Sequence, residues 1–216
     1  MNTNPDSVKI LCFGDSNTWG QKPDRSGRNP ADVRWTGVLQ NLLGDKYYVV
    51  EEGLGGRTID LDLSDRVGRN GKTYLTPCLQ SHNPIDIAII MLGTNDLKIF
   101  FDTTPESIKQ SLSGLVDDVQ EYATDKDQHI PQIILMSPAH INGDAPRFKE
   151  FYIGFFDEKS VEKSRKLADA IKKLCEDRDL SFIDAAKYSK VGEDGLHLDL
   201  DSHAELAQAI ASIIIS

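Results

Sequence analysis

The chain has 216 residues, of which 39% are hydrophobic and 27% are charged, and its formal net charge is -10 at pH 7. This length predicts a single domain over residues 1–216, because one α/β core of this size buries roughly 70% of the unfolded surface and two cores would be small. The acidic balance without a Lys/Arg cluster argues against a nucleic-acid partner, and the lack of a long apolar segment argues against membrane insertion.

The N-terminal residues and the cysteines bear on the compartment. Residues 1–9 have neither the basic start nor the apolar centre of a secretory signal. Cys12, Cys78 and Cys175 are scattered in apolar settings, without a CxxC motif or the spacing of metal ligands. We therefore expect a cytoplasmic protein with reduced thiols, no metal and no cofactor.

A short apolar run at residues 8–13 predicts the first buried strand. It ends at Gly14, where the chain can turn sharply, and presents Asp15, Ser16 and Asn17. Ligands of open α/β sheets bind at the carboxyl ends of the strands, which makes Ser16 a candidate nucleophile. Taken alone, the short motif favours an ordinary strand-to-loop turn in which Ser16 bonds to its own backbone.

Helices and strands then alternate along the chain. The patterns predict these elements in order: a helix over 34–43 capped by Asp32, a strand over 47–50, a helix starting at Thr73 or Thr76, a strand over 85–92, a helix starting at Thr104, a strand over 133–136, a helix over 157–178, a strand over 180–183 and a helix starting at Asp201. Residues 137–156 form a long loop rich in aromatic side chains, which predicts a pocket wall or lid.

This alternation predicts a mainly parallel, five-stranded sheet with helices on both faces. Four polar motifs follow strands of that sheet: GDS at residues 14–16, GLGGRT at residues 53–58, GTND at residues 93–96 and DGLH at residues 194–197. Because the carboxyl ends of parallel strands share one edge, we expect these four motifs to converge there.

These four motifs, in this order, resemble the blocks of the SGNH, or GDSL, hydrolases, whose fold is a three-layer, flavodoxin-like α/β fold. The sequences that flank these motifs, such as CFGDSNTWG and IIMLGTNDLK, resemble those of the bacterial arylesterase and acyltransferase branch, whose members are often homo-oligomers. Asn17 departs from the Leu of the GDSL name, and Gly55 stands where many relatives carry Ser. Both departures bear on substrate choice and leave the catalytic groups in place.

The resemblance assigns roles that the chemistry of the side chains supports. Ser16 is the expected nucleophile, His197 its general base and Asp194 the group that orients the imidazole. The backbone N–H groups of Ser16 and Gly56 and the side-chain amide of Asn95 are the expected oxyanion donors. Without the resemblance, His197 could equally be a capping or core histidine, and Asn95 a loop amide.

The remaining assignments concern the surroundings of these groups. Asp15 and Asp96 are expected to orient loop backbone. The expected substrate pocket includes these residues: Asn17, Trp19, Phe148, Phe151 and Phe155, with Tyr152 and Phe156 adding aromatic bulk. If these aromatic side chains packed inward instead, the pocket would be open.

We therefore expect a serine esterase that acts on small esters with short acyl groups such as acetyl, with acyl transfer to alcohols and acetylated sugars as variants. The first alternative is a lysophospholipase or thioesterase for long acyl chains. An alternative from another class is a flavin or nucleotide binder, which would leave Asp194, His197 and Asn95 unexplained. We also expect a homo-oligomer, because exposed aromatic residues in the loop over 139–156 are typical of an interface.

Overall fold

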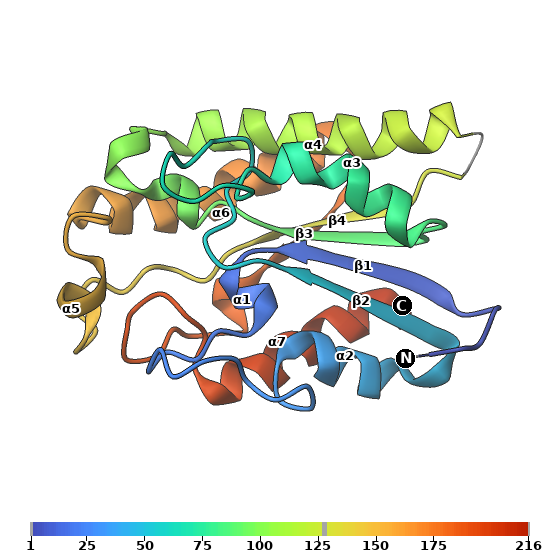
Figure 1. Ribbon diagram of the computed structural model, residues 1–216, viewed down its shortest axis with the longest axis horizontal. Coiled ribbons are helices and arrows are strands. Elements are labelled where there is room, and N and C mark those ends of the chain that lie inside the picture. Colours follow the sequence, from blue (N-terminus) through green and yellow to red (C-terminus); the bar gives the residue numbers. More distant parts are fainter. Residues whose placement is uncertain (1, 127–128, 216) are drawn as a thin grey trace.

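A computed structural model describes residues 2–126 and 129–215. Its centre is a sheet of five strands in the order β2-β1-β3-β4-β5, and all four pairings are parallel (Figure 1). The strands are β1 (Val8–Gly14), β2 (Tyr47–Gly53), β3 (Ile87–Met91), β4 (Gln132–Ser137) and β5 (Ser181–Asp184). This order confirms the predicted flavodoxin-like α/β fold.

Helices cover both faces of the sheet and make three layers (Figure 1). One face carries α3 (Gly71–His82), α4 (Pro105–Asp125) and α6 (Glu158–Arg178), and the other carries α2 (Trp35–Leu43) and α7 (Leu200–Ile215). Two short helices that the sequence did not predict, α1 (Ser16–Trp19) and α5 (Phe148–Tyr152), lie towards the carboxyl ends of the strands. Short 3-10 turns complete the list: Gly44–Lys46, Asn95–Leu97, Ile99–Phe101 and Ala185–Lys187.

Alternate side chains of the strands supply two apolar cores. On β1, Leu11 and Phe13 pack towards the layer of α3, α4 and α6, whereas Ile10 and Cys12 pack towards α2 and α7. The period of two residues in a strand produces this division. All five residues of β3 are buried, as a strand covered on both faces requires. No helix of the described residues is long and apolar enough to cross a membrane.

The N-termini of two helices are satisfied in different ways, one by neighbouring residues and the other by a residue far away in the sequence. Thr104 caps α4 and exchanges hydrogen bonds with Ser107, which confirms the predicted start. The cap predicted for α2 at Asp32 was wrong: α2 begins at Trp35, whose backbone N–H donates to Nδ1 of the buried His203, 3.2 Å away. Distant residues can therefore satisfy a helix terminus whose own neighbours do not.

Two other helix starts also differ from the prediction. Asn70 caps α3 by accepting a hydrogen bond from the backbone N–H of Thr73, so the helix starts before both predicted threonines. The last helix begins at Leu200, and Asp199 rather than Asp201 accepts from the N–H of Ser202. In each case the capping oxygen lies three residues before the N–H that it accepts from, nearer the N-terminus than predicted.

Candidate active site

The first polar motif forms a close turn at the end of β1. A Cβ atom on Gly14 would lie 2.1 Å from Thr18 Oγ1 and 2.9 Å from the carbonyl oxygen of Met91, so no larger residue fits. The need for glycine thus comes from this close packing, and not from the sharp turn that the sequence predicted. Asp15 caps α1 by accepting from the N–H of Asn17, and Ser16 is the first residue of that helix.

Ser16 lies within hydrogen-bond distance of the last polar motif. Its Oγ is 2.9 Å from His197 Nε2, and His197 Nδ1 is 2.6 Å from Asp194 Oδ2. The carboxylate can only accept, so Nδ1 carries the proton and Nε2 accepts from the Ser16 hydroxyl. The structure brings together the three residues that the sequence singled out, in the arrangement that activates a serine hydroxyl.

The charge on Asp194 is held by several donors. Burial raises the pKa of this carboxyl, but the hydrogen bonds and the charge of His197, together with the backbone N–H of Leu196, place the pKa below its usual value. Oδ1 accepts from the backbone N–H groups of Leu196 and His197, and Oδ2 also accepts from the Tyr152 hydroxyl at 3.0 Å. Arg25 Nη1 donates to that hydroxyl at 2.9 Å. This role of Tyr152 and Arg25 had no signal in the sequence, which indicated only aromatic bulk.

The expected oxyanion donors lie around one cleft of about 170 Å³. Ser16, Gly56, Asn95 and His197 all line it. Gly56 has a φ of +82°, which only glycine adopts readily, and it follows β2. The Asn95 amide donates to the Arg57 carbonyl at 3.1 Å and makes a longer contact of 3.4 Å to Asp15 Oδ2. The cleft therefore has both an activated hydroxyl and neighbouring N–H donors.

Arg57 is a structural residue of this site that the sequence analysis missed. Its buried guanidinium donates to the carbonyls of Gly14, at 2.9 Å, and Glu52, and lies 4.2 Å from the centre of the Phe13 ring. Burial lowers the pKa of this guanidinium. Because its own carbonyl accepts from Asn95, Arg57 joins the ends of β1 and β2 to an expected oxyanion donor.

Asp15 and Asp96 hold loop backbone, and burial raises the pKa of both carboxyls, that of Asp96 to about 7. Asp15 Oδ1 accepts from the backbone N–H of Asn17, and Asp96 Oδ1 accepts from that of Ile59, both at 2.9 Å. Asp96 Oδ2 has no hydrogen-bond partner among the described residues. These contacts orient the turns beneath the cleft.

The expected pocket residues divide into two groups. Phe151, Tyr152, Phe155 and Phe156 line the cleft. Asn17, Trp19 and Phe148 do not, which corrects the sequence-based assignment.

Each of the three misplaced side chains has another environment. Asn17 donates to the carbonyl of Leu196 at 3.2 Å and accepts from the N–H of Leu198 at 3.0 Å. Trp19 lies beneath the guanidinium of Arg28, and Phe148 packs in the core. Proximity to Ser16 in the sequence therefore did not place a side chain in the cleft.

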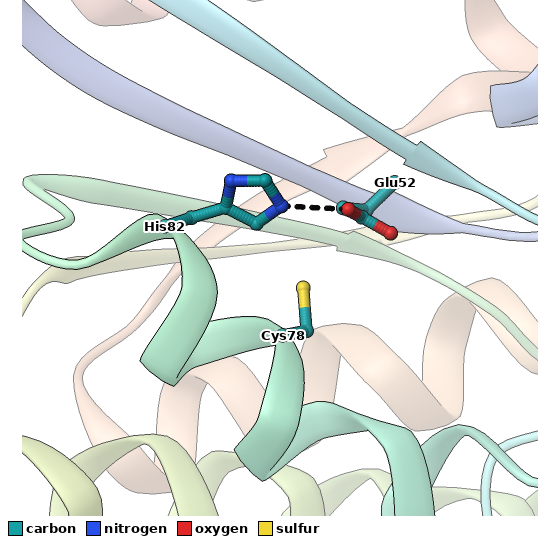
Figure 2. Close-up of side chains that lie close together, drawn as sticks. All are labelled: Glu52, Cys78 and His82. Atoms are coloured by element: carbon teal, nitrogen blue, oxygen red, sulfur yellow. Dashed lines mark hydrogen bonds and ion pairs between the residues drawn. The ribbon is translucent and has the colours of Figure 1, made fainter.

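A second polar cluster lies between β2 and α3. Figure 2 shows Glu52, Cys78 and His82, whose ligand atoms lie within 4.8 Å of one another, a set that chemistry allows to hold a metal ion. His82 Nε2 is 2.7 Å from Glu52 Oε1. Burial, then Glu52, raises the pKa of Cys78 to about 12, which keeps the thiol protonated, although the nearby Arg57 opposes that rise. A hydrogen bond between His82 and Glu52 beside a neutral thiol, with Arg57 as the neighbouring cation, accounts for the cluster.

The chain is similar over nearly its whole length to solved esterases. It is 37% identical to Est24, a carbohydrate acetylesterase from Sinorhizobium meliloti, with a TM-score of 0.90 over 97% of this chain and 99% of that chain. It is 36% identical to the aryl esterase of M. smegmatis, with a TM-score of 0.89 over 97% of this chain and 99% of that chain. A putative arylesterase from Agrobacterium tumefaciens str. C58 is 32% identical, with a TM-score of 0.85 over 96% of this chain and 98% of that chain.

A curated protein, growth arrest-specific protein 6 of Mus musculus, is 39% identical over 49 residues, which are 23% of this chain and 7% of that protein. The chain thus matches only a small part of that protein's length. The model of the GDSL-like lipase/acylhydrolase family matches residues 12–205, which include all four polar motifs. The sequence resemblance is thereby confirmed, and the chain belongs to the GDSL-like lipase/acylhydrolase family.

Proposed function

We propose that the protein is a serine esterase that hydrolyses short-chain acyl esters through an acyl-enzyme on Ser16. The observation that carries the proposal is the continuous series of hydrogen bonds from Ser16 through His197 to Asp194, at the floor of a small cleft. Membership of the GDSL-like family and the similarity to named esterases support it.

The first half of the reaction forms the acyl-enzyme. Ser16 Oγ attacks the ester carbonyl while His197 Nε2 takes its proton, and Asp194 stabilises the imidazolium that results. The oxyanion lies against the N–H groups of Ser16 and Gly56 and the amide of Asn95. One amide N–H of Asn95 stays bonded to the Arg57 carbonyl, and the longer contact to Asp15 is the one that the oxyanion replaces.

The second half releases the acyl group. By the end of the first half His197 has given its proton to the leaving alcohol, and in the second half it takes a proton from a water or a second alcohol that attacks the acyl-enzyme and returns that proton to Ser16. The side chains of Phe151 and Phe155 on the cleft wall favour an apolar alcohol over bulk water. Acyl transfer is therefore part of the proposal, and the chemistry uses only side chains and backbone N–H groups.

The size of the cleft favours short acyl groups. A cleft of about 170 Å³ has room for an acetyl group and part of an alcohol, so most of a long acyl chain would extend out of it into water. The similarity to an aryl esterase and a carbohydrate acetylesterase supports phenol or sugar acetates as substrates. A lysophospholipase or thioesterase is the second candidate, and a flavin or nucleotide binder would leave the Ser16–His197 hydrogen bond without a role.

We also propose that residues 1–216 act as one domain and that the protein is a cytoplasmic homo-oligomer. All five strands belong to one sheet, and the three cysteines are free and buried, which supports a reducing compartment. An apolar patch beside the cleft consists of Ile99, Phe100 and Phe155, with Phe100 52% exposed and Phe155 46% exposed, and the rings of Phe100 and Phe155 lie edge to face with their centres 6.4 Å apart. The backbone N–H of Ile99 donates to the Phe155 carbonyl, which makes the patch continuous. A second copy of the chain covers this patch.

Replacing the nucleophile tests the chemistry. Ser16→Ala should abolish hydrolysis of phenyl acetate and leave the melting temperature near that of the wild type, because His197 is the only hydrogen-bond partner of the Ser16 side chain among the described residues. Steady-state kinetics and calorimetry measure the two effects. Ser189→Ala, which removes a buried serine hydroxyl outside the cleft, is the matched control and should retain activity. Turnover by Ser16→Ala at the wild-type rate would rule out the serine mechanism.

Asn95 should act on the transition state rather than on the bound ester. Asn95→Ala should lower kcat by roughly 10² to 10³-fold with a smaller change in KM, as the loss of one oxyanion donor does. The exposed Asn41 on α2 provides the control variant Asn41→Ala, which should leave both constants unchanged. A rise in KM alone would make Asn95 a ground-state binding residue.

The chain-length preference separates the two enzyme candidates. With acetyl, butyryl, octanoyl and palmitoyl esters of one alcohol, kcat/KM should fall as the acyl chain lengthens, because the cleft is small. When an alcohol such as benzyl alcohol is added, benzyl acetate should form alongside acetate. A rise in kcat/KM from acetyl to palmitoyl would instead favour the lipase-like candidate, and a fall without ester formation would remove acyl transfer.

Light scattering tests the assembly. At micromolar concentration the wild type should have a mass larger than that of one chain, and the double variant Ile99→Ser, Phe100→Ser should shift towards the monomer because it removes two exposed apolar side chains of this patch. Leu42→Ser, which removes an exposed apolar side chain on α2, is the matched control and should leave the mass unchanged. A monomeric wild type would contradict the proposed homo-oligomer.

A further inference from the structure

The cleft above Ser16 is positively charged although the chain as a whole is acidic. Three cationic side chains line it, those of Arg25, Arg66 and Lys98, and no Asp or Glu is among the described residues of its wall. The formal net charge of the protein is -10. Since acidic residues outnumber basic ones by 34 to 24, a wall with only cations is a local feature of the cleft and not a general property of the surface.

Lys98 is the most unusual of the three. Its side chain lines the cleft, the residue is only 7% exposed, and within residues 2–126 and 129–215 its ammonium has no hydrogen bond or ion pair. Asp96, Asp15 and Asp65 act on it only through space, and burial, then the charge of Arg66, lowers its pKa. A lysine buried to this extent normally has a partner, because an unpaired charge is costly to remove from water. The ammonium is not among the buried polar atoms that lack a partner, so it reaches the cleft, where water or a ligand accepts from it.

Arg66 stands beside the same part of the cleft. Its Nη1 would lie 2.8 Å from a Cβ placed on Gly56, so the guanidinium lies directly over an expected oxyanion donor. Among the residues that the structure describes, its guanidinium makes one hydrogen bond to protein, a long contact of 3.4 Å from Nη2 to the Gly55 carbonyl. Arg25, by contrast, donates to Tyr152 at 2.9 Å and stacks over the rings of Phe151 and Tyr152, which fixes its position. Arg66 and Lys98 are therefore the two cations of the cleft that protein contacts constrain least.

We infer that the cleft selects esters whose alcohol half bears an anionic group, a carboxylate or a phosphate, and that Lys98 and Arg66 bind that group. The inference rests on the proposed function, because an acetyl group has no position for a charge and the anion must then be on the alcohol. Ammonium and guanidinium donors facing a carboxylate or phosphate form charge-assisted hydrogen bonds, which are about twice as strong as neutral ones.

The cations could instead act on the oxyanion itself, since both lie near its expected donors. That role would raise the reactivity of every ester alike, whereas binding of an anionic alcohol half raises it only for charged esters. The ratio of kcat/KM between a charged ester and its neutral isostere separates the two roles. It also cancels general losses of activity in a variant.

The wild-type test compares three acetates of para-substituted phenols: 4-acetoxybenzoate, 4-acetoxyphenyl phosphate and the neutral 4-acetoxybenzamide. The inference predicts that kcat/KM for at least one charged ester exceeds that for the amide by roughly 10-fold or more at low salt, and that the excess falls as NaCl is added. The two charged esters distinguish a carboxylate ligand from a phosphate. If the acetate ester of 4-acetoxybenzamide is hydrolysed as well as the charged esters are, the inference is overturned and the proposed function stays intact. If none of the three esters is hydrolysed, the proposed function is contradicted.

The variants assign the preference to residues. Lys98→Met and Arg66→Gln should each lower the charged-to-neutral ratio by roughly 10-fold. Arg66 is exposed, so its variant tests the inference even if the buried Lys98→Met does not fold. Lys172→Gln, which removes an equal charge on α6, is the control and should leave the ratio unchanged. A ratio that stays at the wild-type value in both cleft variants overturns the inference, as does an equal loss for charged and neutral esters.

A binding measurement is independent of turnover. In Ser16→Ala, titration calorimetry should detect tighter binding of the preferred charged ester than of 4-acetoxybenzamide, and the difference should disappear when Arg66→Gln is added. Equal affinity for the charged and neutral esters would overturn the inference whatever reaction the enzyme catalyses.

Discussion

The hydrogen bond between Ser16 and His197 joins two loops that are 181 residues apart in the sequence, and the rest of the site depends on that distance of 2.9 Å. Asn17 holds the two loops together. Its side-chain amide donates to the carbonyl of Leu196 and accepts from the N–H of Leu198. These two residues flank His197, so the backbone that carries the imidazole is held on both sides. A residue next to the nucleophile thereby positions the base, which is why its side chain is not available to the cleft.

The charged groups beneath the cleft have more hydrogen-bond partners within the protein than the ammonium on its wall. Beneath it, Asp194 accepts from Leu196, His197 and Tyr152, and Arg57 donates to carbonyls at the ends of two strands, so these buried charges have several partners each. On the wall, the ammonium of Lys98 has no such partner among the described residues. Charges that are paired within the protein hold its structure together, whereas a cation that faces the cleft without a protein partner is available to a ligand.

The helices and strands of the three layers were predicted well, because each of them produces a short-range periodic pattern in the sequence. The apolar run of β3 and the capping box of α4 involve only residues close together in the chain. The start of α2 could not be predicted in that way, because its N–H partner, His203, lies 168 residues further on. Convergence of the four motifs was predictable since a parallel sheet places all its carboxyl ends at one edge.

The surroundings of the motifs were much less predictable. Arg57, Arg66 and Lys98 are single charged residues in loops, and their roles depend on which distant backbone or cavity they meet. The aromatic loop predicted bulk near the cleft, yet only the folded structure separates Phe155, on the cleft wall, from Phe148, in the core. Loop side chains carry no periodic signal, so their positions follow from the tertiary structure alone.

The proposed mechanism requires that Ser16 carries the acyl group during turnover. Mass spectrometry of the protein, quenched with acid during hydrolysis of an activated acetate and then digested, measures this directly. One added acetyl group is expected on the peptide that contains Ser16, and none on that peptide in His197→Ala. An acetyl group on another residue only, or rapid turnover by the wild type with no acetylated peptide and no burst of alcohol release, would rule out an acyl-enzyme on Ser16.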